Sequence, residues 1–247
     1  MNLERLGLLV PETNTIVELE TAELSRALPD LFARVSIHVS RIPSGTPYET
    51  NPLMFLQDIW TNACQAALLL RTIRPTKCGF FCTAAESSAE GTSPALADVA
   101  GAACAGGALG PIGALREVAR TLNLSSLGIL TPYIPKIGDI VRGAIESVGL
   151  RVTCGVDLGL TTDFEFYPPE RLIQIMRESP LSSCENVFIS CTNLPTLRAI
   201  QTIERSGRQL IMSSNLVLFW WMLRTVLGNA PAALTTPRLF AAERGLS

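Results

Sequence analysis

Histidine and lysine are scarce in this chain of 247 residues. The one histidine, His38, lies in a stretch of alternating apolar residues and is interpreted as structural. His38 is therefore the only possible base for a Cys–His or Ser–His catalytic pair. The only lysines are Lys77 and Lys136. Few candidates thus remain for a Schiff-base or phosphate-binding lysine.

Common cofactor and catalytic motifs are also missing. No Gly-x-Gly-x-x-Gly follows a predicted strand, and neither Gly-x-x-x-x-Gly-Lys-Ser/Thr nor Gly-x-Ser-x-Gly occurs. These absences argue against a nucleotide cofactor and a serine hydrolase. Cys78 and Cys82 alone are weak support for zinc, which takes several closely spaced ligands. We expect no metal site.

The chain lacks a strong basic charge and long hydrophobic runs. A formal net charge of −2 gives no field that would hold a polyanion, so nucleic acid is not an expected partner. The longest apolar run, 216–223, is too short to span a bilayer and is interpreted as a core helix, so no membrane association is expected. Seven cysteines, without a Cys-x-x-Cys pair or a signal-peptide pattern, indicate reduced thiols and a cytoplasmic protein.

A repeated pattern is the strongest positive feature of the sequence. The segment LGLLVP at 6–11 returns as LGILTP at 127–132, and a buried-strand pattern ends in a Cys-Thr pair both at Cys82 and at Cys191. Such self-similarity predicts two half-chains of one design. Each half then carries a cysteine at the carboxyl end of a strand, where open α/β sheets expose their chemistry.

Short apolar runs alternate with segments of helical period, which is typical of parallel sheets covered by helices. Strands are predicted at 6–10, 35–39, 79–82, 127–131, 152–156, 187–191 and 210–212. Helices are predicted at 15–28, 52–71, 135–148, 169–178, 196–206 and 215–227. Thr15 and Glu18 have the spacing of a capping box. The glycine-rich segment 101–110 resists assignment, and 228–237 is predicted to be a loop.

These elements predict the α/β class, with two pseudo-symmetric lobes, each a parallel sheet flanked by helices, and the active site in the cleft between them. We expect an N-terminal lobe over 1–113, completed by a C-terminal helix within 215–247, and a C-terminal lobe over 114–214. An apolar sheet edge or helix face in such lobes often pairs with a second copy, so a homo-oligomer is expected.

Cys82 and Cys191 are the candidate catalytic residues. A helix that begins after a strand-end cysteine offers unpaired N–H groups, which favour the thiolate and can also hold a substrate carboxylate. Thr83, Thr192 and Asn193 stand beside the two cysteines and could add hydroxyl and amide donors. Four other cysteines are interpreted as small buried hydrophobes: Cys64, Cys104, Cys154 and Cys184.

Several motifs together resemble one family. They are GLLVPETNT at 7–15 with Glu18 and Glu20, Cys82-Thr83, TPY at 131–133, SCTNL at 190–194 and SSN at 213–215. In this order they resemble the maleate cis–trans isomerase and arylmalonate decarboxylase branch of the aspartate/glutamate racemase superfamily. The resemblance spans nearly the whole chain.

The resemblance implies an interlobe active site, a small carboxylate substrate and no organic cofactor. It also implies that Cys82 adds as a thiolate to the substrate double bond, giving a succinyl intermediate that can rotate. Cys191 would move a proton at the opposite face, and Asn14 and Tyr133 would bind the substrate carboxylates. Arylmalonate decarboxylases resemble this scaffold but lack the first cysteine, so Cys82 favours the two-cysteine type.

Some positions depart from the family pattern. Glu86 and Glu90 follow the first cysteine where maleate isomerases have mostly apolar residues, and they would repel a dianionic substrate unless they point away from it. Asp163 stands near the place of a substrate-binding Asn.

Three other functions fit parts of the pattern. Two thiols could racemise an amino acid or hydantoin by moving protons at opposite faces of one carbon. Decarboxylation of an arylmalonate would need only Cys191 as proton donor. A ligand-binding protein could keep the cleft without catalysis.

Overall fold

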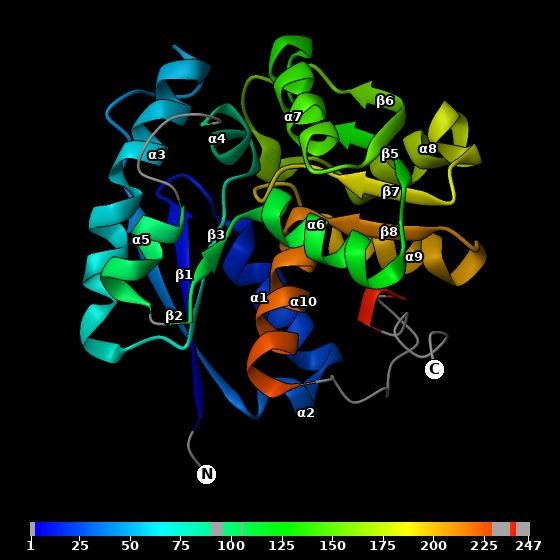
Figure 1. The fold of residues 1–247 in the computed structure, drawn as a ribbon. Helices are drawn as coiled ribbons and strands as arrows, with labels where there is room; N and C mark the ends of the chain where they lie inside the picture. The colour runs from blue at the N-terminus through cyan, green and yellow to red at the C-terminus, as the bar shows by residue number, and fades with distance from the viewer. Residues whose placement is uncertain (1–2, 90–95, 105, 229–237, 241–247) are drawn as a thin grey trace.

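The computed structural model describes residues 3–89, 96–104, 106–228 and 238–240, and its core is two parallel four-stranded sheets (Figure 1). The strand order of the first sheet is β2 (Val35–Ile42), β1 (Glu4–Pro11), β3 (Lys77–Phe80) and β4 (Ala108–Leu109). The strand order of the second is β6 (Arg151–Asp157), β5 (Ser126–Thr131), β7 (Asn186–Ile189) and β8 (Leu210–Ser213). Because both sheets follow one order, the predicted α/β class and the predicted repeat are confirmed.

Helices flank both sheets. The described helices of the first half are α1 (Ile16–Ala27), α2 (Pro29–Phe32), α3 (Pro52–Leu69), α4 (Thr83–Ser88) and α5 (Leu96–Ala103). Those that follow are α6 (Pro111–Leu122), α7 (Pro135–Ser147), α8 (Pro169–Glu178), α9 (Leu197–Ser206) and α10 (Ser214–Leu227). Single 3₁₀ turns are η1 (Arg71–Ile73), η2 (Phe164–Phe166), η3 (Pro180–Ser183) and η4 (Arg238–Phe240). In the described part of the chain, no helix has the length and apolar character needed to cross a membrane.

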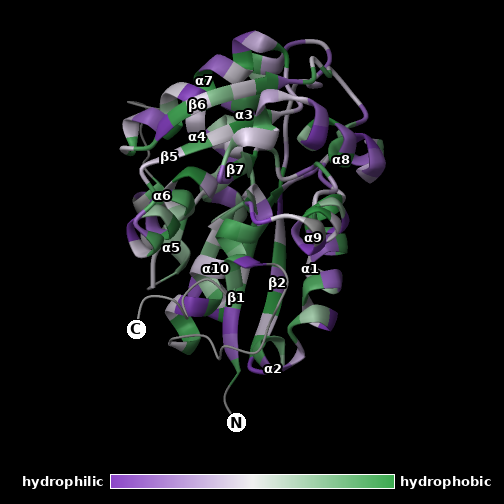
Figure 2. Ribbon diagram, turned by 90° about the vertical axis from the view of Figure 1, so that its right-hand side faces the viewer, coloured by the Kyte–Doolittle hydropathy of each residue, from purple (hydrophilic) through white to green (hydrophobic). Residues whose placement is uncertain are grey.

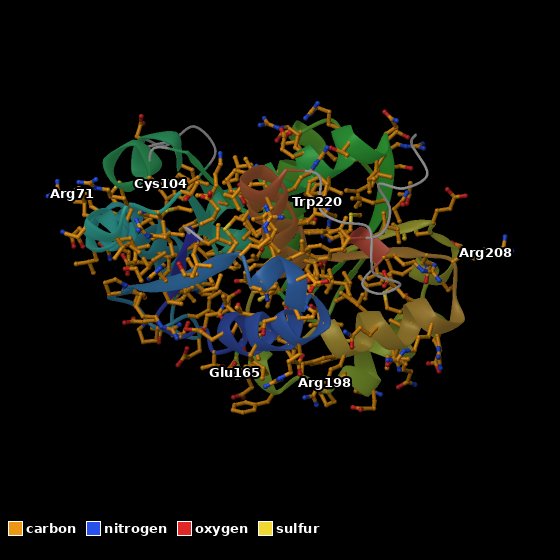
Figure 3. The ribbon with its side chains drawn as sticks, turned by 90° about the horizontal axis from the view of Figure 1, so that it is seen from below. Arg71, Cys104, Glu165, Arg198, Arg208 and Trp220 are labelled. Carbon is orange, nitrogen blue, oxygen red and sulfur yellow. The ribbon has the colours of Figure 1, made fainter. Side chains whose placement is uncertain are left out.

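Helix α10 connects the two halves. It follows the last strand of the second sheet, yet it packs against β3 of the first sheet and against α6. Figure 2 shows hydrophobic residues over α10 and hydrophilic residues on outward helices such as α8. Seen from below, Trp220 of α10 lies centrally, whereas Arg71 and Arg208 lie at opposite margins (Figure 3). The predicted boundary between 113 and 114 stays a prediction.

The predicted start of the first helix differs from the structure. The side chain of Thr15 makes no capping hydrogen bond, and Glu18 pairs with Arg41 instead. The capping oxygen is Oδ1 of Asn14, which accepts from the backbone N–H groups of Ile16 and Val17 at 3.0 and 3.1 Å. The capping box at Thr15 and Glu18 is therefore wrong, since the preceding side chain already satisfies these donors.

Helix α6 was not predicted, and its start explains why. Gly110 lies just before the first turn and Gly113 lies within it, and both lower the helix propensity of this segment. The free N–H groups of Ile112 and Gly113 are satisfied by Glu86, from another element, at 2.8 and 3.1 Å. This cap is tertiary, so no local pattern predicts it.

Three other sequence predictions can be compared directly with the structure. His38 lies half-buried on β2, where its ring contacts Ser36 Oγ at 3.0 Å, which fits a structural role. The segment 101–110 contains the end of α5 and the short strand β4. The loop predicted at 228–237 falls outside the described residues apart from Gly228, whereas the helix predicted at 215–227 is present as α10.

The contact between Gly110 and Glu86 leads to a stability prediction. A Cβ atom at position 110 would collide with the Glu86 carboxyl group and push it away from the start of α6. Gly110→Ala should therefore lower the free energy of unfolding by roughly 1–3 kcal/mol. Gly143→Ala is the matched control, because its Cβ would meet nothing within 4 Å on an exposed helix position and should add about 0.5–1 kcal/mol. Urea unfolding measures both, and equal effects would contradict the role of Glu86.

Candidate active site

A cavity of about 410 Å³ opens at the carboxyl ends of the strands of both sheets. Its lining combines 11–14 at the end of β1 and beyond, 44–49 after β2, Cys82 after β3, Tyr133 after β5, 161–165 after β6 and 191–193 after β7. Open α/β sheets place ligand sites at this edge. Both halves of the chain thus contribute to one cleft, as the repeat predicts.

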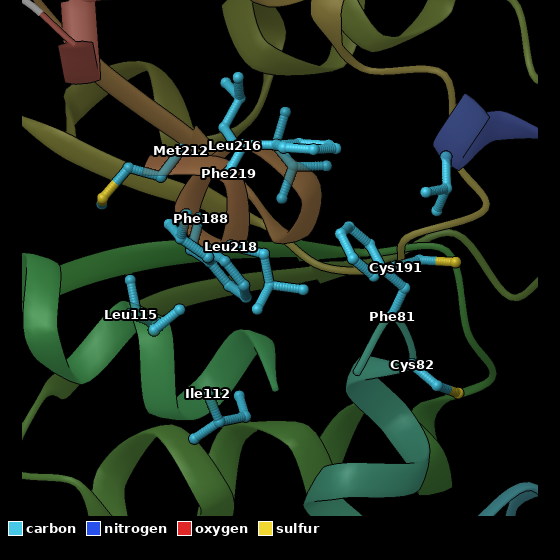
Figure 4. Packing of buried hydrophobic residues seen from close by; sticks show 14 of the residues in the cluster. Phe81, Cys82, Ile112, Leu115, Phe188, Cys191, Met212, Leu216, Leu218 and Phe219 are labelled. Carbon is cyan, nitrogen blue, oxygen red and sulfur yellow. The ribbon is translucent and has the colours of Figure 1, made fainter. Parts of the chain in front are cut away.

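Cys82 and Cys191 both line this cleft. Each follows its strand by two residues, since β3 ends at Phe80 and β7 at Ile189. In Figure 4 both sulfur atoms extend to the same side, away from the hydrophobic cluster that includes Phe188. The structure therefore brings together the two cysteines that the repeat singles out.

One buried hydrogen bond joins the two cysteine segments. The hydroxyl of Thr192, the residue after Cys191, donates to the carbonyl oxygen of Phe81, the residue before Cys82, at 2.6 Å. The same hydroxyl accepts from Asn14 Nδ2 at 3.0 Å. All of these residues are buried. The relative position of the two thiols thus depends on a contact between the halves.

The environment of Cys82 opposes ionisation. Burial raises the pKa of its thiol to about 12, and the nearby Cys191 acts in the same direction. The backbone N–H of Ala85 donates to the sulfur and lowers the pKa, but it offsets only part of the effect. The N–H donor expected at the helix start is therefore present, but desolvation outweighs its effect on the pKa of Cys82.

Cys191 is held in a strained backbone conformation. Its φ of 92° lies in a region that non-glycine residues rarely adopt. Burial raises the pKa of its thiol to about 11, although hydrogen bonds from the Tyr133 hydroxyl and the Asn193 backbone N–H lower it. The Asn193 nitrogen lies 3.4 Å from the sulfur. Cys191 is thus also protonated at neutral pH but has donors ready for its thiolate.

The predicted binding residues differ in their placement. Asn14, Tyr133, Thr192 and Asn193 line the cleft together. The amide of Asn193 accepts from the backbone N–H of Thr15 and donates to Glu165, both within 3.2 Å.

Thr83 is the exception among the predicted binding residues. It is buried, and its hydroxyl lies 2.7 Å from that of Ser214 rather than on the lining of the cleft.

Tyr48 is a cleft residue that the sequence did not indicate. Its ring makes edge contacts with Phe55 and Phe164, with centroids 5.5 and 5.3 Å apart. Its hydroxyl is buried and has no hydrogen-bond partner among the described residues. Burial raises the pKa of Tyr48, and both Cys191 and Cys82 add to this. Because it comes from a loop, no periodic pattern points to it.

Glu20 is a second residue whose role the sequence did not reveal. One carboxylate oxygen accepts from the N–H groups of Thr196 and Leu197 at 2.6 and 2.8 Å. The other accepts from Asn215 Nδ2 at 2.7 Å, and that amide also donates to the carbonyl oxygen of Thr192. Burial raises the pKa of Glu20, while these donors lower it. A buried carboxylate with several donors thus ties α1 to the floor of the cleft.

Carboxylates surround the cleft, and the lining among the described residues includes no Lys, Arg or His. The acidic residues are Glu12, Glu49, Asp163 and Glu165. Glu86 is absent from the lining and accepts from the start of α6, and Glu90 lies outside the described residues. Across the described segments, no group of three or more metal-binding side chains occurs. An anionic substrate would therefore rely on neutral donors.

The raised thiol pKa values predict how the cysteines react with iodoacetamide. Because only the thiolate reacts, alkylation of Cys82 and Cys191 at pH 7 should be at least ~100-fold slower than in urea-unfolded protein. Rates should rise about tenfold per pH unit up to pH 10. Mass spectrometry of quenched peptides measures each site. Tyr133→Phe should slow Cys191 further without slowing Cys82, and a rate plateau below pH 9 would contradict the prediction.

The chain was compared with known proteins. No family model matches it. It is 26% identical to a maleate isomerase from Geobacillus stearothermophilus over 214 residues, covering 81% of this chain and 82% of that protein. The solved maleate cis–trans isomerase of Nocardia farcinica, bound to TRIS, superposes with a TM-score of 0.80 at 22% identity, covering 98% and 100% of the two chains.

Two further solved structures share the fold. A mutant of the Nocardia farcinica enzyme that holds a covalently bound succinylcysteine intermediate has a TM-score of 0.76 at 20% identity, covering 91% of this chain and 93% of that one. A liganded arylmalonate decarboxylase mutant has the same TM-score and identity, covering 96% and 98%. The chain is thus similar in sequence to maleate isomerases and shares its fold with maleate isomerases and arylmalonate decarboxylases, as the sequence motifs predict.

Proposed function

We propose that this protein is a cofactor-independent cis–trans isomerase of maleate or a closely related small dicarboxylate. The observation that carries the proposal is the pair of strand-end thiols, Cys82 and Cys191, which face one cleft from two equivalent half-chains. Relatives named maleate isomerase cover most of the chain, and one of them forms a succinylcysteine intermediate. Both findings support cysteine addition to a double bond.

In the proposed reaction Cys82 loses its proton to solvent and its thiolate adds to one alkene carbon. The π electrons form a carbanion at the neighbouring carbon, and Cys191 protonates it to give a succinyl thioether. The former double bond is now single and rotates. The Cys191 thiolate then removes the proton, the double bond reforms as trans, and the carbon–sulfur bond to Cys82 breaks.

Other cleft residues have matching roles. Tyr133 donates to Cys191 and stabilises its thiolate after proton transfer. The amides of Asn14 and Asn193 and backbone N–H groups hold the carboxylates without a cation. Tyr48 and Phe164 form an aromatic wall that excludes water from the intermediate. Each half of the chain thus supplies one thiol and part of the binding surface.

Racemisation is the second candidate. The two thiols lie near one another, since Cys191 contributes to the raised pKa of Cys82. Once one thiol has lost its proton to solvent, its thiolate can remove a proton at one face of a carbon acid while the other thiol returns a proton at the opposite face. Uptake of solvent deuterium at the α-carbon of a candidate amino acid or hydantoin would distinguish it. Decarboxylation is less favoured because it leaves Cys82 unused.

We further propose that the protein is a cytoplasmic homo-oligomer that binds neither nucleic acid nor membranes. Seven free cysteines support a reducing compartment, and a net charge of −2 argues against polyanion binding. Light scattering measures the oligomeric state.

Proton NMR with maleate in D₂O and no added cofactor tests the proposed function. Fumarate should appear with the native chain, and Cys82→Ala and Cys191→Ser should each lower its rate by at least ~10³-fold, because addition and proton transfer each need a thiol. Cys64→Ser, outside the cleft lining, is the matched control and should retain activity. Fumarate formation by folded Cys82→Ala would overturn the proposed role of that thiol. Absence of fumarate from the native chain would contradict maleate as substrate.

A further inference from the structure

A second pair of cysteines lies outside the cleft, in the C-terminal half. The sulfur atoms of Cys154 on β6 and Cys184 after η3 are 3.1 Å apart. Both side chains are partly exposed, unlike those of Cys82 and Cys191. Neither belongs to the cleft lining, so the proposed isomerase reaction does not use them.

The local sequence creates room for this pair. A Cβ atom on Gly128 of β5 would lie 2.8 Å from the Cys184 sulfur and 3.1 Å from the Cys154 sulfur. The register of β5 against β6 shifts between Leu127 and Gly128, which pairs Gly128 with Cys154. A side chain at position 128 would have to displace both sulfurs. The glycine and the irregular register thus permit the close approach of the two thiols.

The pair is also accessible from solvent. Both cysteines line a surface cavity of about 540 Å³, together with residues from β5, from η3 and from the turn before β7. A small peroxide can therefore reach them. Cys78 and Cys104 also lie near one another, but both are buried, with 1% and 3% of their surface exposed.

We propose that Cys154 and Cys184 are a redox-active dithiol that a hydroperoxide converts to a disulfide. The sulfurs need to approach by only about 1 Å to reach bonding distance, which small side-chain rotations supply. Cytosolic disulfides of this kind are commonly transient and redox-sensing.

The chemistry balances with hydrogen peroxide as the oxidant. One thiolate attacks the O–O bond, giving a sulfenic acid and, after proton transfer, one water. The second thiol displaces the sulfenic hydroxyl as a second water and forms the S–S bond. Two thiols are oxidised, one peroxide is reduced, and no other reactant is consumed.

The two sulfur atoms have different roles in the oxidation. Burial raises the pKa of Cys154 to about 11, and its hydrogen bond with Cys184 acts in the same direction. Both effects disfavour the thiolate of Cys154. Cys184 is the expected attacking sulfur, and Cys154 resolves the sulfenic acid.

Peroxide titration of the reduced full-length protein tests the dithiol. Free thiols are alkylated with N-ethylmaleimide before digestion without reductant, and mass spectrometry follows each cysteine peptide. The Cys154–Cys184 cross-linked peptide should accumulate before Cys82 or Cys191 is oxidised, and dithiothreitol should reverse it. Overoxidation of Cys82 or Cys191 while Cys154 and Cys184 remain alkylated would overturn the proposal.

Single variants provide the control. Cys184→Ser should abolish the cross-link and leave Cys154 alkylated, whereas Cys154→Ser should leave Cys184 as a sulfenic acid that dimedone traps. Circular dichroism shows whether each variant is folded. Dimedone labelling of Cys154 rather than Cys184 would contradict the assigned order of attack. This readout does not depend on isomerase activity.

Discussion

The active cleft depends on the hydrogen bond between the Thr192 hydroxyl and the Phe81 carbonyl oxygen. These residues flank Cys191 and Cys82, so one buried contact sets how the two thiols face each other. Asn14 donates to the same hydroxyl from the first half of the chain. A buried hydroxyl without its partners would cost about 1–3 kcal/mol, so this arrangement resists sliding of one half against the other.

The two thiols of the cleft are buried, and its described lining residues include no positively charged side chain that would attract an anion. Burial raises the pKa of both Cys82 and Cys191, while Ala85 donates to the sulfur of Cys82 and both Tyr133 and Asn193 donate to that of Cys191. Such an environment disfavours ionisation before substrate binds and strengthens each hydrogen bond once water is excluded. The acidic residues around the cleft would oppose a dianion, so neutral donors must compensate. Under the proposed function, this balance selects substrates by shape and hydrogen bonding more than by charge.

Some features of the site required contacts that only the fold creates. From the sequence, Glu86 would repel an anionic substrate, but in the structure its carboxylate accepts hydrogen bonds from the N–H groups at the start of α6. Glu20 sits two residues from Glu18 on the same helix, yet it is buried against Thr196 while Glu18 pairs with Arg41 near the surface. Helical spacing alone cannot tell these roles apart, because the partners come from distant segments.

The sequence by itself determined the α/β class, the two equivalent sheets and the strand-end positions of Cys82 and Cys191, because hydrophobic period and repetition are local properties of the chain. Only the tertiary structure decided that Tyr48 joins the cleft, that Thr83 turns away from it and that the thiols are protonated. Burial and hydrogen-bond partners come from residues far apart in sequence, so pKa and side-chain direction emerge only when the halves pack together.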